Sequence, residues 1–240
     1  MLPLRDTIRS ASFPIVNWIL IAANTLVFLY ETSLGTGALE EFIRAFGMTP
    51  ARLSLVNPLA LVDQPLALAT LFTSQFLHGG WLHLISNMWT LFIFGDNVED
   101  RMGSGRFLVF YLASGMVANL LQAFVFPASN IPTVGASGAI AGILGAYFLL
   151  YPRARVITLI PIFIYPWFVE ISAIFYLGFW FVSQLFSGIY SIGLAGRAGM
   201  GGVAWWAHIG GFIFGLVFVN LFTRRHQAYT RQYPDEYYPW

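Results

Sequence analysis

The sequence contains no cysteine and no lysine, and it carries little charge of either sign. The absence of cysteine excludes disulfides, thiol catalysis and cysteine metal sites. Only 10% of the 240 residues are charged, whereas soluble domains average about 25%, so this chain cannot cover a soluble surface. The net charge is +1, and no clustered basic face indicates nucleic-acid binding.

Apolar residues make up 58% of the chain. A helix needs about 20 such residues to cross the hydrocarbon core of a bilayer. Six runs approach that length, at 13–30, 76–94, 107–126, 135–151, 166–186 and 203–222. They predict an all-α membrane protein, a six-transmembrane-helix bundle over residues 13–222, with an N-terminal segment 1–12 and a C-terminal tail 223–240. The only acid in the fifth run is Glu170.

The connections between the runs set the expected topology. Residues 32–75 are too apolar for a solvated loop, so we expect this first connection to lie partly embedded in the membrane. Residues 95–106 form a polar second connection.

Arginines set the expected orientation in the membrane. With six spans, nine arginines fall on the side of the two termini: Arg5, Arg9, Arg101, Arg106, Arg153, Arg155, Arg224, Arg225 and Arg231. Arg44, Arg52 and Arg197 fall on the other side, so the positive-inside rule predicts cytoplasmic termini.

Ser137 lies in the first turn of the fourth apolar run, in the motif "GASGAIAG". A helix N-terminus offers free backbone N–H groups and a positive dipole end. That environment can stabilise an oxyanion formed by attack of Ser137. The alternative is an N-capping serine followed by small residues that serve helix packing.

His208 lies in the first third of the sixth run, followed by Gly211 and Gly215. These glycines form a small face that allows close helix approach, and Gly138 belongs to a matching face on the fourth run. Two such faces can bring His208 to Ser137 as nucleophile and base. The alternative is a hydrogen-bonded structural histidine.

A third polar group occurs at the start of the second run. His83 and Asn87 are spaced i, i+4 and therefore share a helix face. Both side chains can donate to a developing oxyanion, and a polar clamp between helices is the alternative. Zinc held by His78, His83 and His208 is a weaker option, because no acid and no His-Glu-x-x-His motif accompanies them.

In this order, these motifs resemble the rhomboid family of intramembrane serine proteases, as do "GDNVE" at 95–99 and Gly103-Ser104. The resemblance covers about residues 13–222. It implies that Ser137 is the nucleophile and His208 the base, in a dyad because no acid lies in the second, third, fourth or sixth run. It also implies an oxyanion site formed by His83, Asn87 and the Ser137 N–H, with no metal and no cofactor. The remaining implied roles are structural or gating, for His78, Glu99, Gly135, Gly138, Gly211, Gly215 and Trp180.

The resemblance further implies membrane-protein substrates, and the compact form resembles members from prokaryotic plasma membranes. One position departs from the family pattern, because Ala141 stands where an aromatic often stacks on the catalytic histidine. Packing alone, Tyr147 or Trp205 would then hold the base. Two other functions remain open: a non-catalytic relative that escorts membrane clients, and a small transporter that uses Glu170.

Overall fold

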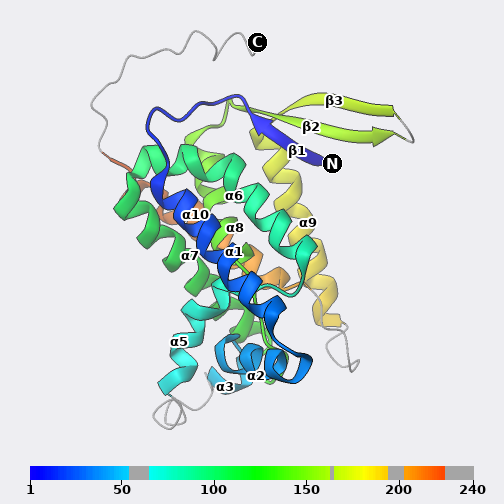
Figure 1. Cartoon of the computed structure of the whole chain (residues 1–240). Helices are drawn as coiled ribbons and strands as arrows, with labels where there is room; N and C mark the ends of the chain where they lie inside the picture. The colour runs from blue at the N-terminus through cyan, green and yellow to red at the C-terminus, as the bar shows by residue number, and fades with distance from the viewer. Residues whose placement is uncertain (54–64, 163–164, 194–202, 225–240) are drawn as a thin grey trace.

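The computed structural model describes residues 1–53, 65–162, 165–193 and 203–224, and most of these residues are helical (Figure 1). Six longer helices form a bundle: α1 (Ile15–Ser33), α6 (Trp81–Met102), α7 (Ser104–Val125), α8 (Ser137–Leu150), α9 (Ala173–Gly193) and α10 (Trp205–Phe222). Four of them, α1, α7, α9 and α10, are long and apolar enough to cross a membrane. The apolar helix α8 has only 14 residues, and α6 ends in charged residues.

The predicted polar connection at 95–106 is wrong, because α6 continues to Met102 and α7 begins at Ser104. The chain reverses at Gly103, whose φ of 79° suits a residue without a side chain. Two polar side chains here, Asn97 and Glu99, are buried rather than solvated. Glu99, which is 2% exposed, accepts hydrogen bonds from the N–H groups of Val16 and Asn17 at 3.1 and 2.7 Å. This carboxylate therefore satisfies two donors at the start of α1.

Glycines bring α8 and α10 into backbone contact at the centre of the bundle. A Cβ added to Gly211 would lie 2.0 Å from the carbonyl oxygen of Gly138, and one on Gly215 would lie 2.1 Å from that of Gly142. At Gly145 an added Cβ would lie 2.2 Å from the carbonyl oxygen of Phe212. The small faces expected from the sequence do meet, and they fix the distance between the two helices.

A three-stranded antiparallel sheet covers one end of the bundle, so the fold is not all-α as predicted. Its order is β1 (Leu2–Asp6), β2 (Arg155–Ile162) and β3 (Tyr165–Ser172). The fifth helix begins at Ala173 instead of residue 166, and Glu170 lies on β3, 3.0 Å from the guanidinium of Arg155. The β-branched run that forms β2 favours a strand, and Pro166 opposes helix extension.

Asp6 fastens β1 to the helices. Its carboxylate accepts hydrogen bonds from the hydroxyl of Tyr147 at 2.5 Å and from the amide of Asn97 at 2.9 Å. Burial raises the pKa of Asp6 to about 7, because a charged carboxylate loses hydration there. The first residues of the chain are therefore packed against the bundle.

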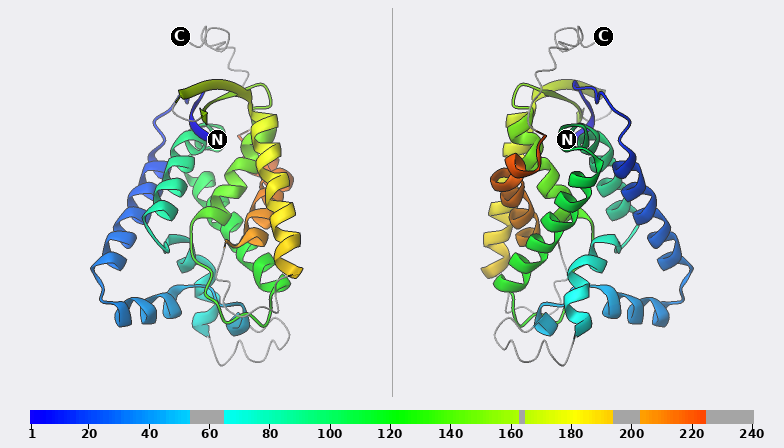
Figure 2. Two further views of the ribbon diagram at one scale, coloured as in Figure 1. Left: turned by 90° about the vertical axis from the view of Figure 1, so that its right-hand side faces the viewer. Right: turned by 90° about the vertical axis from the view of Figure 1, so that its left-hand side faces the viewer.

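The first connection forms short helices at the end opposite the sheet (Figures 1 and 2). They are α2 (Thr36–Phe46), α3 (Pro50–Leu53), α5 (Pro65–Thr73) and the 3-10 turn η1 (Ser74–Phe76). Met48 pairs with Thr133 in an isolated bridge, so this connection is fixed to the loop that leads into α8. Residues 54–64 of the connection and 225–240 of the tail lie outside the described residues.

Candidate active site

Ser137 is the first residue of α8, at the end of a loop that Gly135 makes possible. Gly135 has a φ of 127°, and a Cβ there would lie 2.7 Å from the imidazole of His83. The residue that caps α8 is Ala136, and no side chain bonds to the cap. The alternative that Ser137 is an N-cap is therefore wrong, and its hydroxyl is available for another partner.

That partner is His208. The hydroxyl of Ser137 lies 2.8 Å from Nε2 of His208, and His208 is 8% exposed. The carbonyl oxygen of Gly138, the residue after Ser137, faces the backbone of Gly211, which lies one turn after His208. The close approach of α8 and α10 thus positions two side chains that are 71 residues apart in the sequence.

Gln184 of α9 contacts the other nitrogen of the imidazole. Its Oε1 lies 2.8 Å from Nδ1 of His208, and its Nε2 donates to the carbonyl oxygen of Trp180 and to the hydroxyl of Ser183. An amide oxygen only accepts, so Nδ1 carries the proton and Nε2 is left with a lone pair. In this tautomer, the hydroxyl of Ser137 donates to His208.

The sequence analysis missed Gln184. The signal was present, because a lone amide in an apolar helix is costly and marks a functional candidate. Glu170, the acid in the same predicted span, lies instead on β3 in the sheet.

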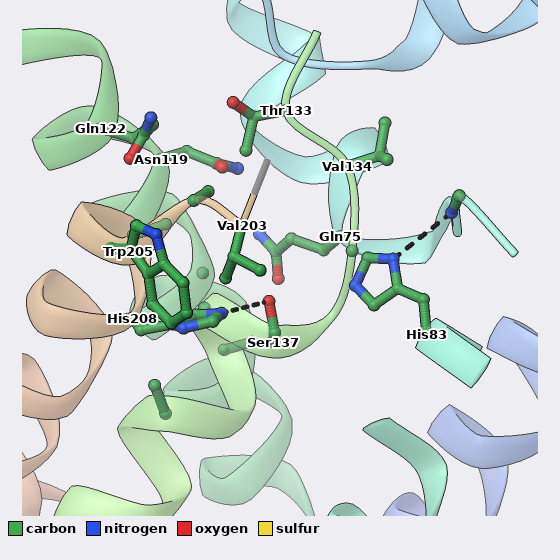
Figure 3. Close-up of a pocket in the computed structure, with 18 of the residues that line it drawn as sticks. Gln75, His83, Asn119, Gln122, Thr133, Val134, Ser137, Val203, Trp205 and His208 are labelled. Atoms are coloured by element: carbon green, nitrogen blue, oxygen red, sulfur yellow. Dashed lines mark hydrogen bonds between the residues drawn. The ribbon is translucent and has the colours of Figure 1, made fainter. Parts of the chain in front are cut away.

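His83 and Asn87 line the same cavity as Ser137 and His208, and Figure 3 shows His83 on the opposite side of Ser137 from His208. Nδ1 of His83 accepts from the N–H of Gly79 at 3.4 Å, which leaves Nε2 as its donor. A Cβ placed on Gly135 would lie 2.7 Å from Nε2 of His83 and 3.7 Å from Oγ of Ser137. The two atoms therefore border one space.

The cavity has a volume of about 1510 Å³. Apolar and polar groups share its wall, and the amides of Gln75, Asn119 and Gln122 lie on one side of it (Figure 3). A space of this size can hold an extended peptide segment together with water.

The remaining residues singled out in the sequence lie around this pair or at a distance. His78 is 3% exposed, and its Nε2 lies 3.1 Å from the amide nitrogen of Asn87. Trp180 places its ring 5.8 Å from that of His208. Glu99 lies at the sheet end and contacts α1. Within the described residues, no group of three histidine or acidic side chains could hold a metal ion.

Three neighbours surround the ring of His208 where Ala141 offers no aromatic. Trp205 meets it edge-on at 6.1 Å and Trp180 lies tilted at 5.8 Å, while Gln184 binds Nδ1. Tyr147 does not take part, because its ring packs against Phe94 and its hydroxyl binds Asp6.

The helical bundle and its apolar spans define an integral membrane protein that carries a paired serine and histidine beside an internal cavity. The chain belongs to the rhomboid family, whose domain model matches residues 65–225.

Three relatives illustrate this membership. Rhomboid protease GluP of Bacillus subtilis is 49% identical over 81 residues, which are 34% of this chain and 15% of that protein. Putative rhomboid protease YdcA of the same organism is 38% identical over 80 residues, 33% of this chain and 40% of the relative. Rhomboid-like protein 11, chloroplastic, of Arabidopsis thaliana is 32% identical over 128 residues, 53% and 42% of the two chains. The alignments thus span less than half of each of these relatives.

Proposed function

We propose that this protein is an intramembrane serine protease that hydrolyses peptide bonds in or near the transmembrane segments of other membrane proteins. The hydrogen bond between Ser137 and Nε2 of His208 at 2.8 Å carries the proposal. A serine is a weak nucleophile until an adjacent base accepts its proton. The names of GluP and YdcA, which include the word protease, support the same class of reaction.

The proposed reaction has two halves. Oγ of Ser137 attacks the scissile carbonyl carbon while its proton passes to Nε2 of His208, and the tetrahedral intermediate then expels the amine, which takes that proton. A water molecule repeats the sequence on the acyl-enzyme and releases the acid.

The carbonyl oxygen gains negative charge during attack and needs donors. We assign this role to the N–H of Ser137 in the first turn of α8 and to Nε2–H of His83, which borders the same space as Oγ. Asn87, which also lines the cavity, supplies a third donor.

We further propose that all six long helices span the bilayer and that the first connection is partly embedded. The sheet end then faces the cytoplasm. Arg106 binds the carbonyl oxygen of Thr223 there, and the N–H of Arg224 binds that of Arg101, so these arginines gather at the end that holds β1. This placement obeys the positive-inside rule, and a prokaryotic plasma membrane fits the Bacillus relatives.

A substrate helix hides its backbone carbonyls in its own hydrogen bonds. It must therefore unwind before Ser137 can reach a peptide bond, so small or helix-breaking residues near the cleaved bond favour hydrolysis. We propose that substrate enters beside α9, whose residues Trp180, Ser187 and Tyr190 line the cavity.

Labelling with a fluorophosphonate tests the proposal, on wild type, Ser137→Ala and His208→Ala in liposomes, together with cleavage of a reporter that contains one transmembrane segment. We expect labelling and cleavage by the wild type and neither by the two variants. Thermal unfolding of each protein shows whether the variants are folded.

A folded wild type that neither labels nor cleaves, but binds the reporter, would contradict the proposal and favour the client-binding alternative. The transporter alternative lost its basis when Glu170 proved to lie on β3 beside Arg155.

A further inference from the structure

The hairpin of β2 and β3 extends beyond the part of the sheet that β1 covers. β1 pairs with β2 only as far as Leu159, whereas β2 and β3 remain paired up to Ile162 and Tyr165. The outer part is therefore a two-stranded ribbon, which is marginally stable in water by itself. In Figure 1 it projects beyond α9 and runs across the helix axes.

The ribbon is also apolar and exposed. Residues 156–169 include no charged side chain. Tyr165, Trp167 and Phe168 are 73%, 57% and 59% exposed, and the charges that flank the run, Arg155 and Glu170, pair with each other at its base. A soluble surface rarely gathers aromatic side chains in this way.

The exposed ribbon continues into the lipid-facing side of the bundle. Ala173 of α9 follows Ser172 of β3 without an intervening loop, and the outer face of α9 exposes Phe175 and Phe179 at 74% and 70%. A hairpin that leaves the end of a spanning helix and runs across its axis lies in the plane of the bilayer surface. Trp, Tyr and Phe are the side chains that favour this depth.

We propose that the tip of the β2–β3 hairpin, here Tyr165 to Phe168, is a membrane-interface anchor that lies within the boundary between headgroups and acyl chains, with Tyr165 and Trp167 on one face of the strand and Phe168 on the other. The occupant of this surface is the lipid leaflet at the sheet end of the bundle. The anchor fixes the height of α9 in the bilayer, because no flexible linker separates the two.

Single cysteines test the anchor, since the chain has none of its own. Trp167→Cys and Phe168→Cys are labelled with an environment-sensitive fluorophore in liposomes that contain nitroxide lipids. Arg5→Cys, exposed on the opposite edge strand, is the matched control. We expect at least threefold stronger quenching of the two tip labels than of the control by shallow nitroxides, and little quenching of the tip labels by iodide.

Equal lipid quenching at the three positions, with iodide reaching the tip labels, would overturn the anchor. So would protection from both quenchers that grows with protein concentration, because that result assigns the tip to a second copy of the chain.

A second inference rests on the proposed function and on a separate observation, the amide of Gln184. Both hydrogens of this amide are committed within α9, to the carbonyl oxygen of Trp180 and the hydroxyl of Ser183. Its oxygen can therefore only face His208, and Gln184 is 5% exposed. The tautomer of the base is thus set by a residue of α9, the helix beside which we propose that substrate enters.

We infer that Gln184 is a positioning residue that makes the orientation of His208 depend on the packed position of α9. When α9 moves away from α10, Nδ1–H loses its acceptor, and the imidazole is free to rotate away from Ser137. His208 is fully oriented only after α9 has packed against α10 again. The protein therefore admits substrate with α9 away from α10 and activates Ser137 with α9 in its packed position, so the two states alternate.

Gln184→Leu removes the acceptor at similar volume. We expect kcat for reporter cleavage and the rate of fluorophosphonate labelling to fall about tenfold to a hundredfold, within the range of general-base effects, with little change in KM. Gln184→Glu restores an acceptor and recovers much of the labelling rate. Its carboxylate also stabilises the imidazolium, so the acid limb of the pH–rate profile moves to higher pH. Val182→Ala, on the exposed side of α9, is the control.

A wild-type rate in Gln184→Leu, with Ser137→Ala inactive, would overturn the role of Gln184 and leave the protease proposal intact. An acid limb that stays at the wild-type pH in Gln184→Glu would also overturn it. A carboxylate that contacts Nδ1 must change the protonation of His208, whereas one that only fills space does not. Failure of the wild type to label would instead overturn the proposed function.

Discussion

The two helices that flank the candidate base are held in different ways. α8 meets α10 largely through glycine backbones, and a carbon added to Gly145, Gly211 or Gly215 would collide with main-chain atoms of the facing helix. α9 meets α10 through side chains. Gln184 binds His208, the indole N–H of Trp206 donates to the carbonyl oxygen of Gly188 at 3.1 Å, and Phe181 stacks on Phe212 at 4.5 Å. Main-chain contact cannot adjust, whereas side chains can change rotamer.

This difference divides the proposed catalytic groups by mobility. Ser137 and His208 lie on the pair of helices that cannot separate without loss of packing, and the group that orients His208 lies on the helix that can. A protease that must admit a helical substrate gains from this division, because the nucleophile and base keep their spacing while one neighbour moves.

The largest effect should come from Gly211→Ala. The new methyl would lie 2.0 Å from the carbonyl oxygen of Gly138, so α8 and α10 must separate, at a cost of about 3 kcal/mol or more. Thermal unfolding in detergent measures the loss of stability, and fluorophosphonate labelling should disappear. Gly105→Ala is the matched control on α7, where nothing lies within 4 Å; it should be neutral or slightly stabilising. Equal melting temperatures for the two variants would show that the α8–α10 contact can adjust, and would contradict its contrast with the α9–α10 contact.

The next effect tests whether the tightly packed bundle around α8 and α10 includes strand β1, which Asp6 joins to α8 and α6. The folded state raises the pKa of Asp6 from 3.8 to about 7, so it binds a proton more tightly than the unfolded chain. Its contribution to stability is complete below about pH 4 and is lost as pH rises to about 7. The melting temperature should therefore fall from pH 5 to pH 8, and Asp6→Asn should reduce that fall.

A smaller effect is expected from Trp206→Phe. The change removes the hydrogen bond to Gly188 but touches neither His208 nor Gln184, and one such bond contributes about 0.5–1.5 kcal/mol. If α9 positions the base, weaker docking of α9 should slow labelling about twofold to fivefold, and should do so without changing the acid limb of the pH profile. A faster rate in this variant would show that the packed position of α9 hinders the reaction.

The smallest effect should come from Gly188→Ala, the counterpart of Gly211→Ala on the adjustable side. Its methyl would lie 3.0 Å from Cδ1 of Ile209, the end of a side chain that can shift. We expect a change in stability below about 1 kcal/mol and retained labelling. A loss as large as that of Gly211→Ala would show that the α9–α10 contact is also rigid.

Much of the helical bundle could be predicted because each helix carries its own long apolar run. The sheet could not, since residues 156–169 have the composition of a membrane span, and the pairing of β2 with β3 and with β1, about 150 residues earlier, cannot be read from that composition. The boundary at 95–106 failed for a related reason. Its charged residues looked solvated, yet Glu99 has partners on α1 that no local pattern reveals.

The candidate site divides in the same way. Glycine spacing and position near helix starts predicted that Ser137 and His208 could meet, because those features are local. The third partner, Gln184, stands in a run with no motif around it. Its role depends on the direction in which α9 crosses α10, which is tertiary information.

The pairing of β1 with β2 carries a consequence for synthesis of the chain. Strand β1 is synthesised before the bundle, but its partner residues 156–159 follow only after α1, α6, α7 and α8 have been made. Until then the edge of β1 that pairs with β2 has no native partner, although Asn97 and Tyr147, which bind Asp6, have already been made. Closing the sheet is therefore a late event in biogenesis, and a nascent chain stalled shortly before residue 156 should expose its first residues to protease, whereas one released after residue 172 should protect them.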